Sequence, residues 1–258
     1  MTKITEIKIQ SPKGNIAAVI NYPEDEAKYL AILCPGYLDS KNYKHLTGLA
    51  ESLSEQGIIT VRFEPIGTWE SEGEISDYTT TQYLEDIKNV LNYMTSDKSY
   101  KQIILVGHSR GGQVSILYAA KDPRISLVIG IMPSSNRTMT EERLESWEKK
   151  GIRASHRDLP EDGVKQKEFV VPFSHADDAK RYDVTAEVRK IKVPIVLIAG
   201  ELDSVCSQRD VKEIFNNANE PKKFIMINNI GHDYRHNENE IKIVDGKTLE
   251  ALREYLKS

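Results

Sequence analysis

The sequence predicts an α/β fold with a mainly parallel sheet and helices on both of its faces. Continuous apolar runs, which are typical of strands buried on both faces, alternate with segments whose apolar residues recur at helical spacing. At 258 residues, the chain is long enough for one large domain with a sizeable core. We therefore expect residues 1–258 to form a single domain, with an insertion at about 137–181 where the alternation stops.

The first half of the chain establishes this alternation after an opening hairpin. Residues 4–10 and 16–22 alternate in polarity and flank a turn that contains Pro12 and Gly14, which is typical of two antiparallel strands. Apolar strands and amphipathic helices are then expected in turn at residues 29–34, 46–53, 58–63, 83–94 and 103–106. In sheets of this kind, ligands bind beyond the carboxyl ends of the strands.

The second half continues the same pattern around the insertion. Strands and helices are expected at residues 125–132, 193–200, 211–218, 223–228 and 249–256. The insertion holds a charged helix at 141–150, a hairpin that turns at 159–163 and an apolar patch at 169–173, but no buried parallel strand. Its aromatic residues favour a small lid over the sheet, because a disordered loop would carry few of them.

Composition and charge narrow the class of protein. Thirty-five basic and 39 acidic residues give a net charge of −4, and no segment gathers basic residues with interleaved aromatics, so neither nucleic acid nor an anionic membrane is expected as a partner. Cys34 and Cys206 are too few for a disulfide framework or a metal cage. With no apparent signal-peptide core or membrane span, we expect a soluble, reduced, cytoplasmic protein.

The most informative motif is the Gly-x-Ser-x-Gly run at residues 107–111. It directly follows the apolar strand at 103–106 and leads into an amphipathic helix, so Ser109 would stand at a sharp strand-to-helix turn. Glycines allow the strand and the helix to approach closely at such a turn. The alternative is a glycine-rich turn whose serine only caps the helix, but the flanking strand and helix favour a nucleophile.

A serine nucleophile requires an imidazole base and a carboxylate that orients the imidazole, in the chain order serine, acid, histidine. Of six histidines, His232 alone comes just after a predicted strand, where a short loop would hold it at the carboxyl edge of the sheet. Asp203 follows an earlier strand and is the expected acid, with Asp183 as the alternative. Taken singly, Asp203 could be a helix-capping carboxylate and His232 a surface histidine.

The oxyanion of an acyl-transfer intermediate also needs two backbone N–H donors. We expect one from Arg110, at the start of the helix after Ser109, and the other from Tyr37, in the loop after the strand at 29–34. An ordinary Pro-Gly turn at Pro35-Gly36 is the alternative for this loop.

Two rival chemistries are less favoured. His232 and His236 are four residues apart, as in a zinc-binding helix, but Gly231 before them and an Asn-rich segment after them favour a loop. Cys34 ends a buried strand and precedes a proline, which is typical of an inert structural thiol. We expect no metal and no organic cofactor.

Three motifs in this order, Gly107 to Gly112, Gly200-x-x-Asp203 and Gly231-His232, resemble those of the α/β-hydrolase fold over nearly the whole chain. The insertion and the segment Lys192-Val193-Pro194-Ile195 resemble those of bacterial cinnamoyl/feruloyl-esterase-like and monoacylglycerol-lipase-like serine hydrolases. Such relatives usually carry His-Gly at the oxyanion loop, whereas this chain has Pro35-Gly36.

The resemblance implies a carboxylesterase that acts through an acyl-enzyme on small to medium esters, aromatic-acid esters among them. Trp147, Phe169 and Phe173 are candidates for lining its substrate pocket. The alternatives are an aminopeptidase, a thioesterase or a carbon–carbon bond hydrolase on the same triad, a non-catalytic ligand-binding member of the fold, or a metal-dependent hydrolase.

Overall fold

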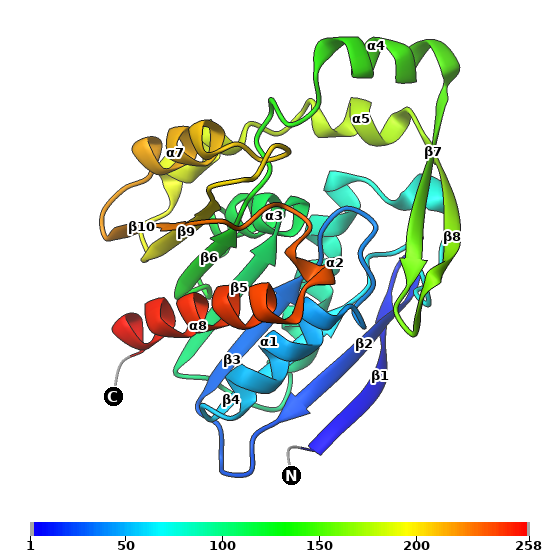
Figure 1. The fold of residues 1–258 in the computed structure, drawn as a ribbon. Coiled ribbons are helices and arrows are strands. Elements are labelled where there is room, and N and C mark those ends of the chain that lie inside the picture. Colours follow the sequence, from blue (N-terminus) through cyan, green and yellow to red (C-terminus); the bar gives the residue numbers. More distant parts are fainter. Residues whose placement is uncertain (1–2, 257–258) are drawn as a thin grey trace.

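A computed structural model describes residues 3–256, and its centre is an eight-stranded sheet (Figure 1). In order across the sheet, the strands are β1 (Lys3–Ser11), β2 (Gly14–Tyr22), β4 (Ile58–Phe63), β3 (Tyr29–Cys34), β5 (Gln102–His108), β6 (Leu127–Ile131), β9 (Ile195–Gly200) and β10 (Lys222–Ile227). Strand β2 pairs antiparallel with both β1 and β4, and all other neighbours are parallel. The structure thus confirms the predicted α/β fold with its mainly parallel sheet.

Helices cover both faces of the sheet. One face carries α1 (Lys44–Ser54) and α8 (Glu238–Tyr255), and the other carries α2 (Thr80–Met94), α3 (Arg110–Ala119), α6 (Val184–Glu187) and α7 (Gln208–Asn217). Strand β3 shows why both faces are needed: Leu30 and Ile32 belong to one buried cluster, and Ala31 and Leu33 to the other. Within residues 3–256, no helix is long and apolar enough to cross a membrane.

Most predicted elements form where the apolar pattern places them, but α8 is longer than the expected 249–256. The Asn237 side chain accepts hydrogen bonds from the backbone N–H groups of Asn239 and Glu240, so this asparagine begins the helix about ten residues earlier. Ile241 and Val244 are buried on the first turns. Their apolar pattern was therefore present in the sequence, although the predicted helix did not include it.

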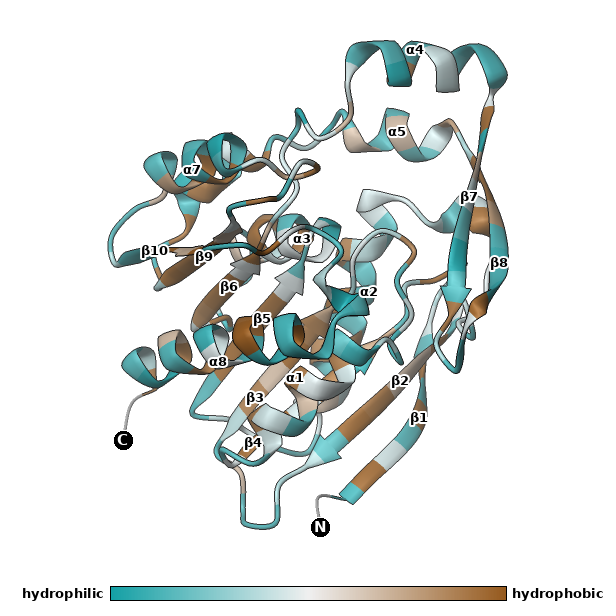
Figure 2. Cartoon of the chain, in the orientation of Figure 1, coloured by the Kyte–Doolittle hydropathy of each residue, from teal (hydrophilic) through white to brown (hydrophobic). Residues whose placement is uncertain are grey.

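The insertion at 137–181 lies between β6 and β9 and forms α4 (Glu141–Lys150), β7 (Ile152–Leu159), β8 (Asp162–Pro172) and α5 (Ser174–Ala179) (Figure 1). Strands β7 and β8 pair antiparallel in a sheet of their own. Figure 2 shows β7 as largely hydrophilic, whereas the central strands are hydrophobic. Trp147, Phe169 and Val171 are buried and join the main core cluster, so these apolar side chains attach the insertion to the rest of the molecule.

Cys34, at the end of β3, is fully buried, and this burial raises the pKa of its thiol to about 12. The thiol therefore stays protonated at neutral pH and is unsuited to act as a nucleophile. Cys206 is also a buried free cysteine.

The turn from β5 into α3 requires glycine at two positions. A Cβ on Gly111 would lie 1.9 Å from the carbonyl oxygen of Cys34, and a Cβ on Gly107 would lie 2.2 Å from the carbonyl carbon of Gly111. Because both contacts are with backbone atoms, no side-chain movement could relieve them. The missing Cβ atoms allow β5, α3 and the end of β3 to approach one another closely.

Replacing Gly111 with alanine is expected to destabilise the fold, because the added methyl group would overlap the Cys34 carbonyl. Overpacking of this kind costs about 1–3 kcal/mol, measured as the free energy of unfolding in urea. Gly246 is a matched control: it lies within α8, nothing surrounds its Cβ position within 4 Å, and Gly246→Ala should stabilise by about 0.5–1 kcal/mol. Equal stability of G111A and the parent protein would contradict the close approach.

Candidate active site

Ser109 occupies a strained position at the turn from β5 to α3. Its backbone has φ 54° and ψ −119°, in the positive-φ region that non-glycine residues rarely adopt. The Ser109 N–H donates to the Ile131 carbonyl at the end of β6 (2.9 Å), and the Ser109 carbonyl accepts from the Ser134 N–H (3.0 Å). These hydrogen bonds help to hold the strained residue at the carboxyl edge of the sheet.

The structure brings His232 and Asp203 into line with this serine. His232 Nε2 lies 2.9 Å from Ser109 Oγ, and His232 Nδ1 lies 2.8 Å from Asp203 Oδ2. The other carboxylate oxygen of Asp203 accepts from the N–H groups of Val205 and Cys206, both at 2.8 Å, which fixes the carboxylate. Asp183, the alternative acid, instead caps α6 by accepting from the N–H groups of two residues of that helix. Geometry therefore selects Asp203 as the partner of His232.

The surroundings of His232 favour its charged form. Burial alone would lower the pKa of His232, but the hydrogen bond to the Asp203 carboxylate, with a further contribution from Cys206, raises it above its ordinary value of 6.5. Because the Asp203 carboxylate binds Nδ1–H, the neutral ring presents an unprotonated Nε2 to Ser109.

The sequence did not predict a chain of two further polar groups, Ser134 beside Ser109 and Cys206 beside Ser134. Ser134 Oγ lies 3.4 Å from Ser109 Oγ, and Cys206 Sγ lies 3.5 Å from Ser134 Oγ. Ser134 belongs to the Pro-Ser-Ser-Asn segment that follows β6, so its place after a buried strand was the signal available.

The backbone around Tyr37 and Arg110 suits the binding of an anion. Neither N–H group donates a hydrogen bond to any residue between 3 and 256, so both remain available to a ligand. The loop that carries Tyr37 is held by two tyrosine hydroxyls: Tyr83 donates to the Pro35 carbonyl (2.8 Å), and Tyr78 accepts from the Leu38 N–H (3.1 Å). These contacts support the loop although Pro35 stands where the resemblance implies a histidine.

Asp39, from the same loop, is buried between two imidazoles. Its Oδ2 lies 3.7 Å from His45 Nε2 and 3.9 Å from His108 Nδ1. Burial alone would raise the pKa of Asp39, but His108, His45 and Arg157 reverse this effect and lower it well below its usual range. Burial lowers the pKa of both imidazoles, so they remain neutral at neutral pH. The buried carboxylate is therefore stabilised by dipoles and by the Arg157 cation.

Two groups in the described part of the chain have the residue types of a metal site: Asp39 with His45 and His108, and Asp203 with Cys206 and His232. In the Asp39 group, the distances from Asp39 Oδ2 to His45 Nε2 (3.7 Å) and to His108 Nδ1 (3.9 Å) both exceed the separation of roughly 3.4 Å between neighbouring ligand atoms of a tetrahedral zinc ion. In the second, His232 and Asp203 already bind each other. The less favoured alternative, a zinc-binding helix through His232 and His236, does not form, because Tyr234–His236 make one 3-10 turn.

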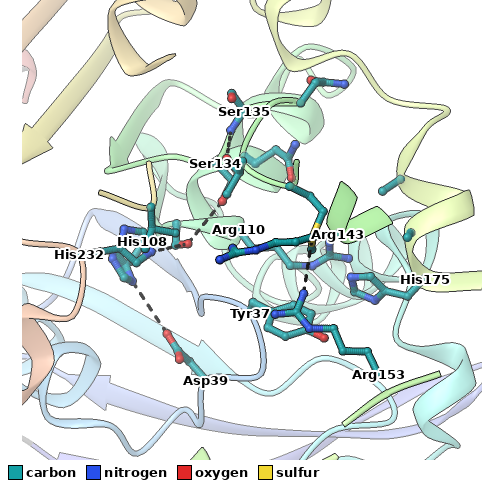
Figure 3. Close-up of a pocket in the computed structure, with 18 of the residues that line it drawn as sticks. Tyr37, Asp39, His108, Arg110, Ser134, Ser135, Arg143, Arg153, His175 and His232 are labelled. Atoms are coloured by element: carbon teal, nitrogen blue, oxygen red, sulfur yellow. Dashed lines mark hydrogen bonds and ion pairs between the residues drawn. The ribbon is translucent and has the colours of Figure 1, made fainter. Parts of the chain in front are cut away.

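A cavity of about 540 Å³ opens beside Ser109 and His232 and extends beneath the insertion. Figure 3 shows Asp39, His108 and His232 on one side of it and Arg153 and His175 on the other. Trp147 lines the cavity and stacks on His175, with ring centres 5.7 Å apart. Phe169 and Phe173 are absent from the lining within residues 3–256. Phe169 packs on Trp69, and Phe173 packs beside Trp147.

The β7–β8 hairpin of the insertion contacts the segments that carry Tyr37 and His232. Arg157 donates a hydrogen bond to the Tyr37 carbonyl. Asp158 accepts two hydrogen bonds from Arg235, at 2.8 and 2.6 Å, and its own carbonyl accepts from the Tyr43 hydroxyl at 2.8 Å. The hairpin is thus attached both to the loop that carries Tyr37 and to the segment that follows His232.

The comparison with known families decides the family of the chain. Residues 25–183, more than half of the 258, match the Hydrolase_4 family model, which is described as serine aminopeptidase, S33. The chain belongs to this family of α/β hydrolases. The hydrolase is 24% identical over 181 residues to the mitochondrial palmitoyl-protein thioesterase ABHD10 of Rattus norvegicus. The matched residues make up 67% of this chain but only 58% of ABHD10.

Solved structures share the fold of this hydrolase over nearly its whole length. Est1E from Butyrivibrio proteoclasticus, solved with ferulic acid bound, matches with a TM-score of 0.79 at 22% identity and covers 96% of this chain and 98% of its own. The α/β hydrolase GrgF from Penicillium sp. sh18 matches with a TM-score of 0.82 at 19% identity. This match covers 98% of this chain and 99% of the GrgF chain. At these identities, the likeness concerns the fold.

The His232–Asp203 contact predicts a measurable titration. In an NMR titration, the His232 imidazole is expected to titrate above pH 6.5, because the carboxylate stabilises the imidazolium. Asp203→Asn removes the negative charge and should lower this pKa. Asp183→Asn, which removes the same charge from the α6 cap, should leave it unchanged. A His232 that titrates below 6.5 in the parent protein would contradict the electrostatic argument.

Proposed function

We propose that this hydrolase cleaves carboxylic esters through an acyl-enzyme formed on Ser109. The observation that carries the proposal is the continuous hydrogen-bonded line from Asp203 through His232 to Ser109. A serine hydroxyl is a weak nucleophile at neutral pH, and a neutral imidazole in contact with its oxygen is the usual means of activating it.

In the proposed mechanism, Ser109 Oγ attacks the ester carbonyl carbon while His232 Nε2 takes the hydroxyl proton. The tetrahedral intermediate collapses, the bond to the alcohol breaks, and His232 returns the proton to the departing oxygen. Water then attacks the acyl-enzyme with the same base, which releases the acid and restores the serine. Asp203 holds the imidazole in the required tautomer and stabilises its cation throughout.

The backbone N–H groups of Tyr37 and Arg110 are the proposed donors to the oxyanion. Both are without an internal partner in the part of the chain that the structure describes, and both flank Ser109 across the close contact between β3 and α3. Donors already in place at the developing charge supply much of the acceleration in acyl transfer.

The cavity supports substrates of small to medium size. Its volume of about 540 Å³ falls within the usual range of small-molecule sites. Thioesters are the second candidate substrates of the same chemistry, because ABHD10 is a palmitoyl-protein thioesterase.

The charges of the cavity make aminopeptidase activity less favourable, although the family description names it. An aminopeptidase must bind a substrate ammonium group, which calls for a free carboxylate. The cavity lining within residues 3–256 holds only two carboxylates, Asp39 and Asp233. Asp39 is already surrounded by His45, His108 and Arg157, and Asp233 shares the lining with six cationic side chains that would repel an ammonium group.

Replacing Ser109 with alanine is expected to reduce turnover of 4-nitrophenyl butyrate by at least about 10³-fold, because the nucleophile is lost. A fluorophosphonate probe should label the parent protein at Ser109 and leave S109A unlabelled. Ser96→Ala, at an exposed serine after α2, should leave turnover and labelling unchanged. A folded parent protein that takes up no probe would favour a non-catalytic member of the fold.

The rate should also depend on the protonation of His232. Below its pKa the imidazole cannot accept the Ser109 proton, so kcat/KM should fall about tenfold per pH unit on the acid side. The midpoint should lie above 6.5 and agree with the NMR titration of the free enzyme. A kcat/KM that stays constant from about pH 5 to 8 would argue against a histidine base.

A further inference from the structure

The cavity beside Ser109 is lined by more cationic than anionic side chains. Against two carboxylates it carries six cations, namely Arg110, Arg143, Arg153, Arg157, Arg235 and Lys180. The excess is local, because the whole chain has a net charge of −4. A water-filled cleft with one sign of charge attracts ligands of the opposite sign.

Three of the six cations already have protein partners. Arg235 is paired with Asp158, Lys180 lies 3.4 Å from Asp177, and Arg157 donates to the Tyr37 carbonyl. Arg110, Arg143 and Arg153 have no carboxylate within 4.0 Å in residues 3–256. Figure 3 shows these three arginines together, beside Tyr37 and His175.

Arg110 is the most unusual of the three, because only 6% of its surface is exposed. Its Nη2 donates one long hydrogen bond to Thr80 Oγ1 (3.3 Å), and its guanidinium lies 5.0 Å from the centre of the Tyr78 ring. Its buried Nε has no hydrogen-bond partner in the described chain. A buried cation without a counter-charge is unfavourable, and a bound anion would relieve that cost.

Arg153 is held mainly by aromatic rings. Its guanidinium lies 5.9 Å from the centre of the Tyr37 ring and 5.5 Å from that of the Trp147 ring. Within residues 3–256, its one side-chain hydrogen bond is to Met139 Sδ, a weak acceptor. Ring contacts fix the guanidinium while leaving N–H groups free for the paired contacts that carboxylates and phosphates accept. His175 does not compete for an anion, since burial and the cations Arg110 and Arg153 lower its pKa well below 6.5.

We propose that this cavity selects acyl substrates that carry a second, anionic group, a carboxylate or a phosphate, which Arg110 and Arg153 bind under the insertion. Arg143 adds to the positive potential from the exposed side of α4. The inference rests on the proposed function for the substrate's ester group, but the binding of the anion is independent of catalysis. Half-esters and half-thioesters of dicarboxylic acids, and esters that carry a phosphate, are the substrate classes that fit.

The kinetic test compares esters that differ in one charge. We expect kcat/KM for mono-(4-nitrophenyl) glutarate to exceed that for its neutral methyl ester by about tenfold or more, with the preference seen mainly in KM. The 4-nitrophenyl ester of 3-phosphonopropionate, compared with its dimethyl phosphonate, tests phosphate-type recognition. The acetate ester of 4-hydroxybenzoate, compared with its methyl ester, tests an anion on the departing alcohol. Equal rates within all three pairs would overturn the proposal.

Variants assign the preference to the proposed arginines. Arg153→Gln should remove most of the preference, because kcat/KM for the anionic ester should fall about tenfold more than kcat/KM for the neutral ester. Arg143→Gln, at an exposed position of α4, should reduce the preference in the same direction and serves if R153Q does not fold. Arg209→Gln removes the same charge from an exposed position of α7, outside the cavity. An equal effect of R209Q would mean that only net charge matters and would overturn the assignment.

A binding measurement separates this inference from the proposed function. Calorimetry on S109A should show that glutarate or 3-phosphonopropionate binds, that glutaramide does not, and that adding R153Q weakens anion binding about tenfold. Anion binding without turnover of any ester would support the inference and contradict the esterase proposal. Turnover of neutral esters without anion binding would support the esterase proposal and contradict the anion-binding inference.

Discussion

The close backbone contact between the β5–α3 turn and the end of β3 is the constraint on which the rest of the site depends. Gly107 and Gly111 permit it, because any side chain there would meet main-chain atoms. The contact places Ser109 in its strained conformation and holds the loop with Tyr37 against the start of α3. Strain at Ser109 is tolerated because the strands and helices on either side are buried and mutually packed.

Sequence patterns predicted the sheet and the three central residues for one physical reason. Strands buried on both faces must be continuously apolar, so their carboxyl ends, and the polar residues just after them, can be located without coordinates. Ser109, Asp203 and His232 all follow such strands. The choice between Asp203 and Asp183 required the structure, because the sequence does not show which carboxylate reaches an imidazole and which caps a helix. The position of β4 between β2 and β3 likewise comes only from the coordinates.

The insertion was predicted less well, because its side chains do not follow one buried face. The apolar patch in β8 suggested a pocket wall, but Phe169 packs against Trp69, so only Trp147 of the three predicted aromatic residues lines the cavity. Short α5 has little apolar periodicity and was missed. The cluster of Arg110, Arg143 and Arg153 could not be predicted for another reason. These residues are scattered through the sequence and line one cavity only because α3, α4 and β7 come together in the fold.

The contacts of Arg157 and Asp158 make the hairpin part of the machinery that positions the site. One residue holds the Tyr37 carbonyl and the next holds Arg235, three positions after His232. A chimaera with the corresponding segment of another α/β hydrolase would therefore lose both anchors along with the substrate-facing surface. Transferring this hairpin to another hydrolase in order to change its substrate range would require Tyr43 and Arg235 to be transferred as well, because Asp158 binds both residues.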